Sequence, residues 1–189
     1  MGACTVRVIT GSARGRVLKT LEGEDVRPTT DRVKEAIFSI IQFEIEGREV
    51  LDLFAGSGQL GIEALSRGAA YSTFVDLNKD AVSVIKSNLL ATGLHRNSAV
   101  LQSDAFAFLR NSKKKFDIVF MDPPYSKGLL QKALPLVADV MNDGGVIICE
   151  HPYGEEMPQN VGRFSFYREY KYSKLALTVY RLDEGVDAE

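Results

Sequence analysis

The spacing of hydrophobic residues changes several times along the chain and divides it into elements. From residue 49 onward, short apolar runs alternate with stretches in which apolar residues recur at every third or fourth position. This alternation of strand and helix patterns is typical of an α/β fold with a doubly wound, mostly parallel sheet. Strands are predicted at residues 49–54, 71–77, 98–104, 116–122 and 144–150, with helices between them.

A further helix is predicted just before this alternating region. Within RPTTDRVKEAIFSII, one side of the helix is apolar and faces the core, formed by Val33, Ala36, Ile37, Ile40 and Ile41. Thr30 or Asp31 can cap its start, because a side-chain oxygen there accepts a free backbone N–H. Pro135 is predicted to divide a later helix into two short pieces, since proline removes a hydrogen bond and clashes with the preceding turn.

The two ends of the chain carry strand patterns of another kind. Residues 6–18 contain two apolar runs around a Gly-Ser-Ala-Arg-Gly centre, which predicts a hairpin or a pair of short strands. Residues 164–180 show period-two alternation, which predicts an antiparallel hairpin that closes one edge of the sheet. Its tight turn is placed near Ser173, where glycine is the expected residue.

The composition is that of a soluble globular protein. Of 189 residues, 45% are hydrophobic and 25% are charged. No apolar run is long enough to cross a bilayer, and the N-terminus lacks the apolar segment of a secretory signal, so we expect a cytoplasmic protein without membrane contacts. Cys4 and Cys149 are too few for a disulfide framework and lack metal-ligand spacing, so free thiols and no metal site are expected.

Charge is distributed unevenly, although the net charge is only -2. Residues 6–20 contain no acidic residue, and their basic residues are Arg7, Arg14, Arg16 and Lys19. Such a segment can contact nucleic-acid phosphates or form a solvated hairpin, and both interpretations stay open. Arg27, Thr29 and Arg32 surround the start of the first helix, where their donors and the free N–H groups either hold an anion or only cap the helix.

The stretch FDIVFMDPPY, residues 116–125, ends a buried strand in a stiff turn. Pro123 and Pro124 have no N–H, so strand pairing stops at Asp122. The Asp122 carboxylate and the Pro123 carbonyl offer two acceptors, and Tyr125 offers an aromatic face. These groups suit a planar base with an exocyclic amine, because the acceptors take both amine hydrogens while the ring stacks. A strand-ending turn without chemistry would carry the same residues.

The stretch VLDLFAGSGQLG, residues 50–61, forms the first strand-to-helix turn. Gly56 and Gly58 bring bare backbone against a ligand, and Gly61 completes the pattern G-x-G-x-x-G. Asp76 ends the second strand, where a carboxylate can accept both hydroxyls of a ribose. NAD and S-adenosylmethionine fit these features equally, but Asp52 favours a cationic ligand over a pyrophosphate.

Asp104 ends the third predicted strand and can meet an adenine amine. Because the carboxyl ends of parallel strands meet at one rim of a sheet, these acidic residues and the glycine turn are expected to line one cleft with Asp122.

The segments TGSARGRVL, RPTTDRVKEAIFSII and LDLFAGSGQLGIEALSRGA, together with DPPY, resemble the RsmD-type family, bacterial methyltransferases that modify guanine N2 in 16S ribosomal RNA. The resemblance runs from about Arg7 to Arg181. It implies a Rossmann-like, S-adenosylmethionine-dependent domain over 29–182, between a basic hairpin arm at 1–28 and an acidic tail at 183–189. The implied partner is 16S ribosomal RNA within an assembling small subunit, the implied protein is a monomer, and no metal is implied.

The resemblance also implies roles for individual residues. Cofactor contacts fall on Asp52, Ala55, Gly56, Ser57, Gly58, Asp76, Leu77, Asp104 and Ala105. Positioning of the target base falls on Asp122, Pro123 and Tyr125. RNA contacts are predicted for Arg7, Arg14, Arg16, Lys19, Arg27 and Arg32.

The implied chemistry is direct in-line transfer of a sulfonium methyl group to guanine N2. Asp122 and Pro123 would orient the amine, so no separate strong base is needed. His95 and His151 have no Ser-His-Asp arrangement, and both are expected in loops. Three alternatives stay open, namely a DNA amino-methyltransferase, an NAD oxidoreductase and a non-catalytic RNA-binding module.

Overall fold

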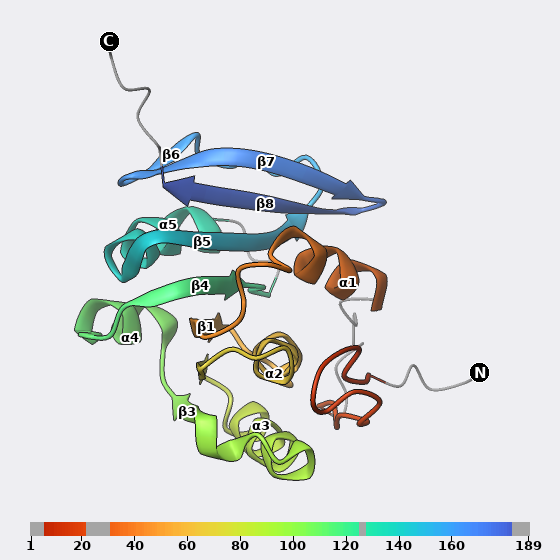
Figure 1. Cartoon of the computed structure of the whole chain (residues 1–189). Coiled ribbons are helices and arrows are strands. Elements are labelled where there is room, and N and C mark those ends of the chain that lie inside the picture. The colour runs from red at the N-terminus through yellow and green to blue at the C-terminus, as the bar shows by residue number, and fades with distance from the viewer. Residues whose placement is uncertain (1–5, 22–30, 125–127, 183–189) are drawn as a thin grey trace.

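Eight described strands form one sheet that runs from one end of the molecule to the other (Figure 1). The structure is a computed structural model and describes residues 6–21, 31–124 and 128–182. The strands are β1 (Glu49–Leu53), β2 (Tyr71–Asp76), β3 (Ser98–Gln102), β4 (Phe116–Met121), β5 (Met141–Pro152), β6 (Asn160–Val161), β7 (Phe164–Tyr172) and β8 (Leu175–Leu182). Their order across the sheet is β3-β2-β1-β4-β5-β8-β7-β6.

Strands β1 to β5 pair in parallel and confirm the predicted doubly wound arrangement. At the centre of the sheet, Asp52 of β1 lies between Phe74 of β2 and Phe120 of β4. The chain reaches the β3 edge and then returns to β4, so the strand order reverses between β1 and β4. Ligands of such sheets bind beyond the carboxyl ends of the strands at this reversal.

Two layers of helices cover the sheet. The helices are α1 (Asp31–Ile40), α2 (Gln59–Ser66), α3 (Lys79–Thr92), the short 3-10 helix η1 (His95–Asn97), α4 (Ala105–Asn111) and α5 (Leu129–Asp139). α1, α2 and α3 pack on one face, where Ile37, Leu60 and Ile85 are buried in one core. α4 and α5 cover the other face, where Leu109 and Leu134 are buried. The predicted apolar side of α1 therefore faces the core.

The prediction that Pro135 divides a helix is wrong. α5 continues through Pro135 and ends at Asp139. The proline ring lies on the exposed side, whereas Ala133, Leu134 and Val137 on the other side are buried against the sheet. Burial of this apolar face outweighs the local cost of proline, as tertiary packing often does.

The predicted C-terminal hairpin is confirmed. β7 and β8 pair antiparallel up to Tyr172 opposite Leu175, which leaves a two-residue turn. Ser173 in this turn has a φ of 57°, the left-handed conformation that glycine adopts most readily. Serine therefore occupies the position where the pattern predicts glycine, and the hairpin forms around it.

β5 buries two side chains that the sequence analysis singles out. His151 is fully buried within this strand, so its placement in a loop is wrong; its Nε2 lies 2.8 Å from the Thr178 hydroxyl oxygen of β8. The fifth strand is longer than the pattern indicates, because β8 pairs with it as far as Pro152. Cys149 is a buried free thiol, as expected, and Cys4 lies outside the described residues.

The N-terminal segment, residues 6–21, bends back on itself through one isolated bridge between Arg7 and Val17. Val8 and Leu18 are buried in the core on the α1, α2 and α3 side of the sheet. The segment is therefore packed against the domain along one side, while its basic side chains point outward from it.

Candidate active site

The loop between β1 and α2 has an unusual backbone conformation. Gly56 and Gly58 have φ values of 54° and 76°, and Phe54 shares the left-handed region with a φ of 65°. The Gly56 N–H donates to a carboxylate oxygen of Asp76 at 2.8 Å, which ties the loop to the end of β2. This glycine loop presents its backbone at the beginning of α2, where a helix has free N–H groups.

Asp52 lies under the glycine loop and is only 3% exposed. The backbone N–H of Gly61 in α2 donates to its carboxylate at 2.8 Å. Burial raises the pKa of Asp52 to about 8, the Gly61 N–H opposes this shift, and the negative charges of Asp122 and Asp76 add to it. Ionising the buried Asp52 is therefore costly, and a positively charged ligand beside it would lower that cost.

Gly61 serves packing, not contact with a ligand. A Cβ atom at this position would lie 2.3 Å from the Phe74 ring and 2.7 Å from the Ser72 hydroxyl of β2. We therefore expect Gly61→Ala to lower the free energy of unfolding by about 1–3 kcal/mol, because the helix must move away from the sheet. Urea denaturation measures this change. Gly93→Ala is the comparison, because a Cβ there meets nothing within 4 Å although φ is 78°. It shows the effect of backbone strain without crowding. A loss of stability in Gly93→Ala but not in Gly61→Ala would contradict the packing role of Gly61.

The ends of β2 and β3 supply the next predicted residues. Both carboxylate oxygens of Asp76 accept backbone N–H groups at 2.8 Å, one from Gly56 and one from Asn78. Leu77 follows and is 67% exposed. Asp104 caps α4 by accepting the Ala107 N–H at 2.8 Å. Each carboxylate keeps lone pairs for a further donor.

The end of β4 lies across from the glycine loop. Asp122 follows the strand and is half-buried, and Pro123 is buried. The parallel register places Met121 of β4 beside Cys149 of β5, so Asp122 and Glu150 follow side by side. Tyr125, the third predicted member of this turn, lies outside the described residues.

All these strand ends open into one cleft of about 820 Å³. Of the predicted cofactor residues, those that line it are Asp52, Ala55, Gly56, Ser57, Asp76, Leu77, Asp104 and Ala105. Asp122 and Pro123 line it too. Gly58 lies behind this lining, buried at the start of α2. The cleft is within the size range of small-molecule and cofactor sites.

Several lining residues were missed by the sequence analysis. Glu150, at the end of β5, is 5% exposed, and Thr20 and Leu21 line the cleft from the N-terminal segment. Only Glu150 could have been predicted from the sequence. It is an acidic residue on a predicted strand of the parallel sheet, as Asp52 and Asp122 are. No local signal distinguishes Thr20 and Leu21 from other loop residues.

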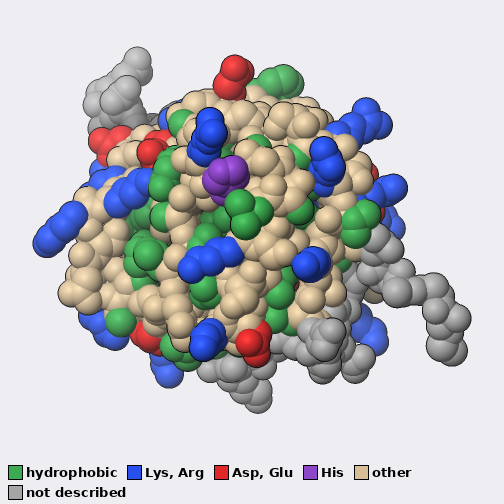
Figure 2. Space-filling view, turned by 90° about the horizontal axis from the view of Figure 1, so that it is seen from below, with side chains coloured by type: hydrophobic (Ala, Val, Ile, Leu, Met, Phe, Trp, Pro, Cys, Tyr) green, Lys and Arg blue, Asp and Glu red, His purple; other side chains and the backbone are tan. Residues whose placement is uncertain are grey.

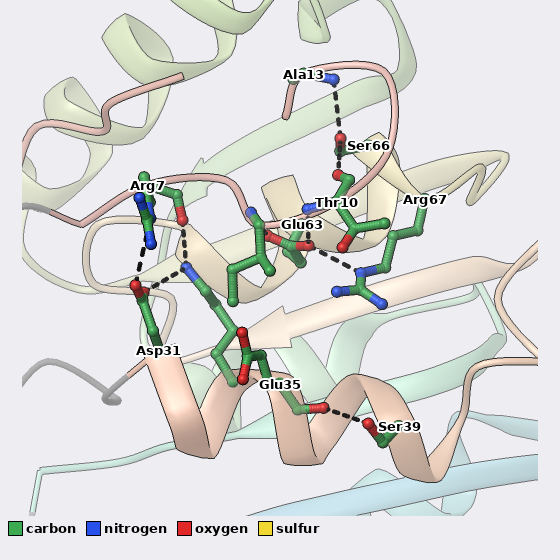
Figure 3. A network of polar contacts seen from close by, with 11 residues as sticks. Arg7, Thr10, Ala13, Asp31, Glu35, Ser39, Glu63, Ser66 and Arg67 are labelled. Atoms are coloured by element: carbon green, nitrogen blue, oxygen red, sulfur yellow. Dashed lines mark hydrogen bonds and ion pairs between the residues drawn. The ribbon is translucent and has the colours of Figure 1, made fainter. Parts of the chain in front are cut away.

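The predicted RNA-contacting residues lie on the N-terminal segment and on α1. Among the exposed ones are Arg14, Arg16, Lys19 and Arg32. Seen from the α3 and β3 side, the surface carries more Lys and Arg than Asp and Glu side chains (Figure 2). Arg7 is also exposed, but its guanidinium pairs with Asp31 of α1 at 3.4 Å (Figure 3). Arg27 lies outside the described residues.

A buried carboxylate holds the N-terminal segment on α2 (Figure 3). Glu63 of α2 is fully buried, and it accepts the Ile9 N–H at 2.7 Å and the Thr10 N–H at 2.9 Å. The Arg67 side chain donates to the same carboxylate at 2.8 Å. The segment is thereby attached to the helix that begins at the glycine loop.

The described residues, 6–21, 31–124 and 128–182, contain neither a metal-binding group nor a membrane span. In these ranges, no three His, Cys, Asp or Glu side chains are grouped so that they could hold a metal ion. No helix there is long and apolar enough to cross a membrane.

Comparison with known proteins decides the family. The model of the family described as "Conserved hypothetical protein 95" matches residues 6–181. The chain belongs to this family. It is the RsmD-type family that the motifs resemble, and the match includes the N-terminal segment, the parallel sheet and the C-terminal hairpin.

Relatives of this RsmD-type protein cover most of its length. It is 37% identical over 182 residues to ribosomal RNA small subunit methyltransferase D of Escherichia coli (strain K12), covering 95% of this chain and 91% of the relative. It is 42% identical over 137 residues to the protein of the same name from Haemophilus influenzae, covering 71% of each. The solved structure of yhhF from Escherichia coli has a TM-score of 0.85 at 36% identity, covering 96% of this chain and 99% of that one.

Proposed function

We propose that this RsmD-type protein transfers a methyl group from S-adenosylmethionine to the N2 amine of a guanine in small-subunit ribosomal RNA. The observation that carries the proposal is the shared cleft, which the glycine loop lines together with Asp122 and Pro123. A relative 37% identical to nearly the whole chain is named a small-subunit ribosomal RNA methyltransferase, which supports ribosomal RNA as the substrate.

The residues of the cleft fit S-adenosylmethionine. Asp52 is a buried carboxylate with a raised pKa, so a ligand that carries a positive charge would relieve the cost of ionising it. Asp76 keeps lone pairs for the two ribose hydroxyls, because each oxygen is occupied by only one backbone N–H. Asp104 and Ala105 would then meet the adenine on the same wall.

The cofactor, when bound, supplies a methyl group that its positive sulfur has already activated. The residues of the chain then have to hold the accepting nitrogen in line. The Asp122 carboxylate and the Pro123 carbonyl would accept the two N2 hydrogens, which directs the nitrogen lone pair toward the methyl group. Such alignment can contribute about 7–11 kcal/mol to lowering the barrier. The carboxylate would also stabilise the positive charge that develops on the nitrogen. As the new nitrogen–carbon bond forms, the carbon–sulfur bond would break, a neutral thioether would leave, and one N2 proton would pass to water.

Glu150 supports guanine as the target base. Its carboxylate is buried beside Asp122 and can only accept hydrogen bonds when ionised. Guanine presents two adjacent donors on this edge, the N1–H and the N2 amine. Adenine has an acceptor at N1, which a carboxylate would repel. Two acidic residues at neighbouring strand ends therefore match the guanine edge.

The Glu150→Gln variant tests this match. We expect its kcat/KM for RNA methylation to fall about 10- to 100-fold, because one charged hydrogen bond to the base is lost. Replacing the target guanine by 2-aminopurine, which keeps the N2 amine but has an acceptor at N1 in place of N1–H, should abolish this loss. The kcat/KM of the variant should then equal or exceed that of the unchanged protein, because a carboxylate repels the N1 acceptor and the glutamine amide does not. Glu169→Gln, an exposed glutamate of β7, serves as the control. An undiminished effect of Glu150→Gln on the 2-aminopurine substrate would exclude a contact with N1–H.

The RNA would approach along the N-terminal segment. Arg14, Arg16 and Lys19 are exposed there, and phosphate contacts by such side chains make binding sensitive to salt. The target guanine must lie in a loop or flip out, because a duplex hides the N2 amine from a pocket.

Methylation of small-subunit particles decides the proposed function. Particles from a strain that lacks the gene should accept labelled methyl from S-adenosylmethionine, and mass mapping should place the label on a guanine. Duplex DNA serves as the alternative substrate, and calorimetry with NAD tests the alternative cofactor. Label on DNA alone, label on an adenine, or binding of NAD in place of S-adenosylmethionine would refute the assignment.

A further inference from the structure

Asn88 of α3 joins two segments that lie far apart in the sequence. Its side chain is buried, with 1% exposed. The amide nitrogen donates to the Lys19 carbonyl and to the Ser57 carbonyl, both at 3.0 Å. The amide oxygen accepts the Lys19 N–H at 2.8 Å. Both ends of the side-chain amide are therefore used to hold backbone groups of other elements.

The two partners of Asn88 belong to different parts of the cleft. Ser57 lies in the glycine loop, on the cofactor side. Lys19 belongs to the N-terminal segment, and the two residues that follow it, Thr20 and Leu21, line the cleft themselves. One buried amide thus fixes the distance between the cofactor loop and the segment that carries the exposed basic residues.

We propose that Asn88 is a positioning residue that couples cofactor binding to RNA binding. A cofactor that restricts the motion of the glycine loop would also restrict that of the N-terminal segment through Asn88. RNA bound to that segment would restrict the motion of the loop in the same way. Coupling between two ligands is reciprocal, so each should bind more tightly in the presence of the other. The RNA half of this inference rests on the proposed function, whereas the cofactor half does not.

The first experiment follows backbone amide exchange in the N-terminal segment, with S-adenosylhomocysteine as the probe. The Val8 and Leu18 amides donate within the segment, to Arg16 and Val6 carbonyls at 2.9 and 2.8 Å, so they report its opening without touching Asn88. We expect saturating probe to slow both amides at least about fivefold in the unchanged protein. In Asn88→Ala the same saturation should leave their exchange rates unchanged.

Two further variants keep this experiment decisive. Asn88→Asp has nearly the same shape and still accepts the Lys19 N–H, but it has no donor for the two carbonyls, so it should lose the effect as Asn88→Ala does. It replaces the alanine variant if that one does not fold. Asn97→Ala removes an exposed amide that donates to the Ala70 carbonyl at 3.0 Å, and it should keep the full effect.

The second experiment measures binding of unmethylated small-subunit particles with and without S-adenosylhomocysteine. The probe should tighten binding at least about fivefold in the unchanged protein and not at all in the Asn88 variants. Equal slowing of the Val8 and Leu18 amides in the Asn88 variants, or no slowing in the unchanged protein, overturns the proposal. If the unchanged protein fails to methylate the particles, the proposed function fails, and the amide exchange alone then decides the role of Asn88.

Discussion

Replacing Asp122 with alanine is expected to lower kcat for RNA methylation by about 10²- to 10³-fold, with the affinity for S-adenosylmethionine nearly unchanged. Asp122 follows β4 and lines the cleft, and the two prolines after it restrict its backbone. In the proposed mechanism, its loss removes both the orientation of the N2 amine and the charge that stabilises the nitrogen during transfer. Single-turnover methylation measures the chemical step, and calorimetry measures cofactor binding.

Two further variants serve as comparisons for Asp122→Ala. Asp122→Asn keeps one acceptor oxygen but no charge, so its loss of turnover should be smaller than that of the alanine variant. Asp143→Ala is the matched control, because Asp143 is exposed near the opposite end of β5. Single-turnover rates near those of the unchanged protein in Asp122→Ala would remove Asp122 from the mechanism.

Asp52→Asn is expected to weaken binding of S-adenosylmethionine about 10- to 100-fold, because a neutral amide cannot pair with a cationic ligand. The pKa of Asp52 is raised to about 8, so the carboxyl holds its proton at neutral pH until a cation displaces it. Affinity of the unchanged protein should therefore rise with pH up to about 8 and then level off. Calorimetry across this range should find the affinity of the variant independent of pH, and a pH-independent affinity in the unchanged protein would contradict the assignment.

The same substitution should make the protein more stable. Asp52 has a folded pKa above its unfolded value of 3.8, so its favourable contribution is complete below about pH 4 and is lost as pH rises toward 8. In that window this one group lowers the free energy of unfolding by up to about 1.4 kcal/mol per pH unit. The Asn variant does not lose stability in this way as the pH rises, and its Oδ1 can still accept the Gly61 N–H. Thermal denaturation at pH 5 and pH 7 should show the advantage growing with pH.

Local patterns predicted the elements because their causes are local. Alternating apolar runs, the glycines after β1 and the two prolines after β4 act within a few residues, and the parallel sheet and the C-terminal hairpin follow them closely. Pro135 is the instructive exception, since its local effect is overcome by the buried face of α5. His151 is another, because only β8 on the other side of β5 makes its position an interior one.

The candidate site also combines residues that local patterns could place with residues that they could not. The residues at the ends of β1, β2 and β4 could be placed on one rim, because parallel strands align their carboxyl ends. Thr20 and Leu21 could not, since the N-terminal segment that carries them is held by hydrogen bonds to α2 and α3, far along the chain. Asn88 illustrates this distance, as it holds Lys19 from 69 residues away and Ser57 from 31 residues away.

The amino-acid sequence by itself determined the order of strands and helices, the stiff turn after β4, the glycine loop and the family. These depend on backbone sterics and on the period of apolar residues, which neighbouring residues set. Only the tertiary structure decided that Asp52 is buried with a raised pKa, that Glu150 lies beside Asp122, and that Asn88 joins the N-terminal segment to the glycine loop. Burial and long-range hydrogen bonds exist only once distant segments have packed together, so no local pattern records them.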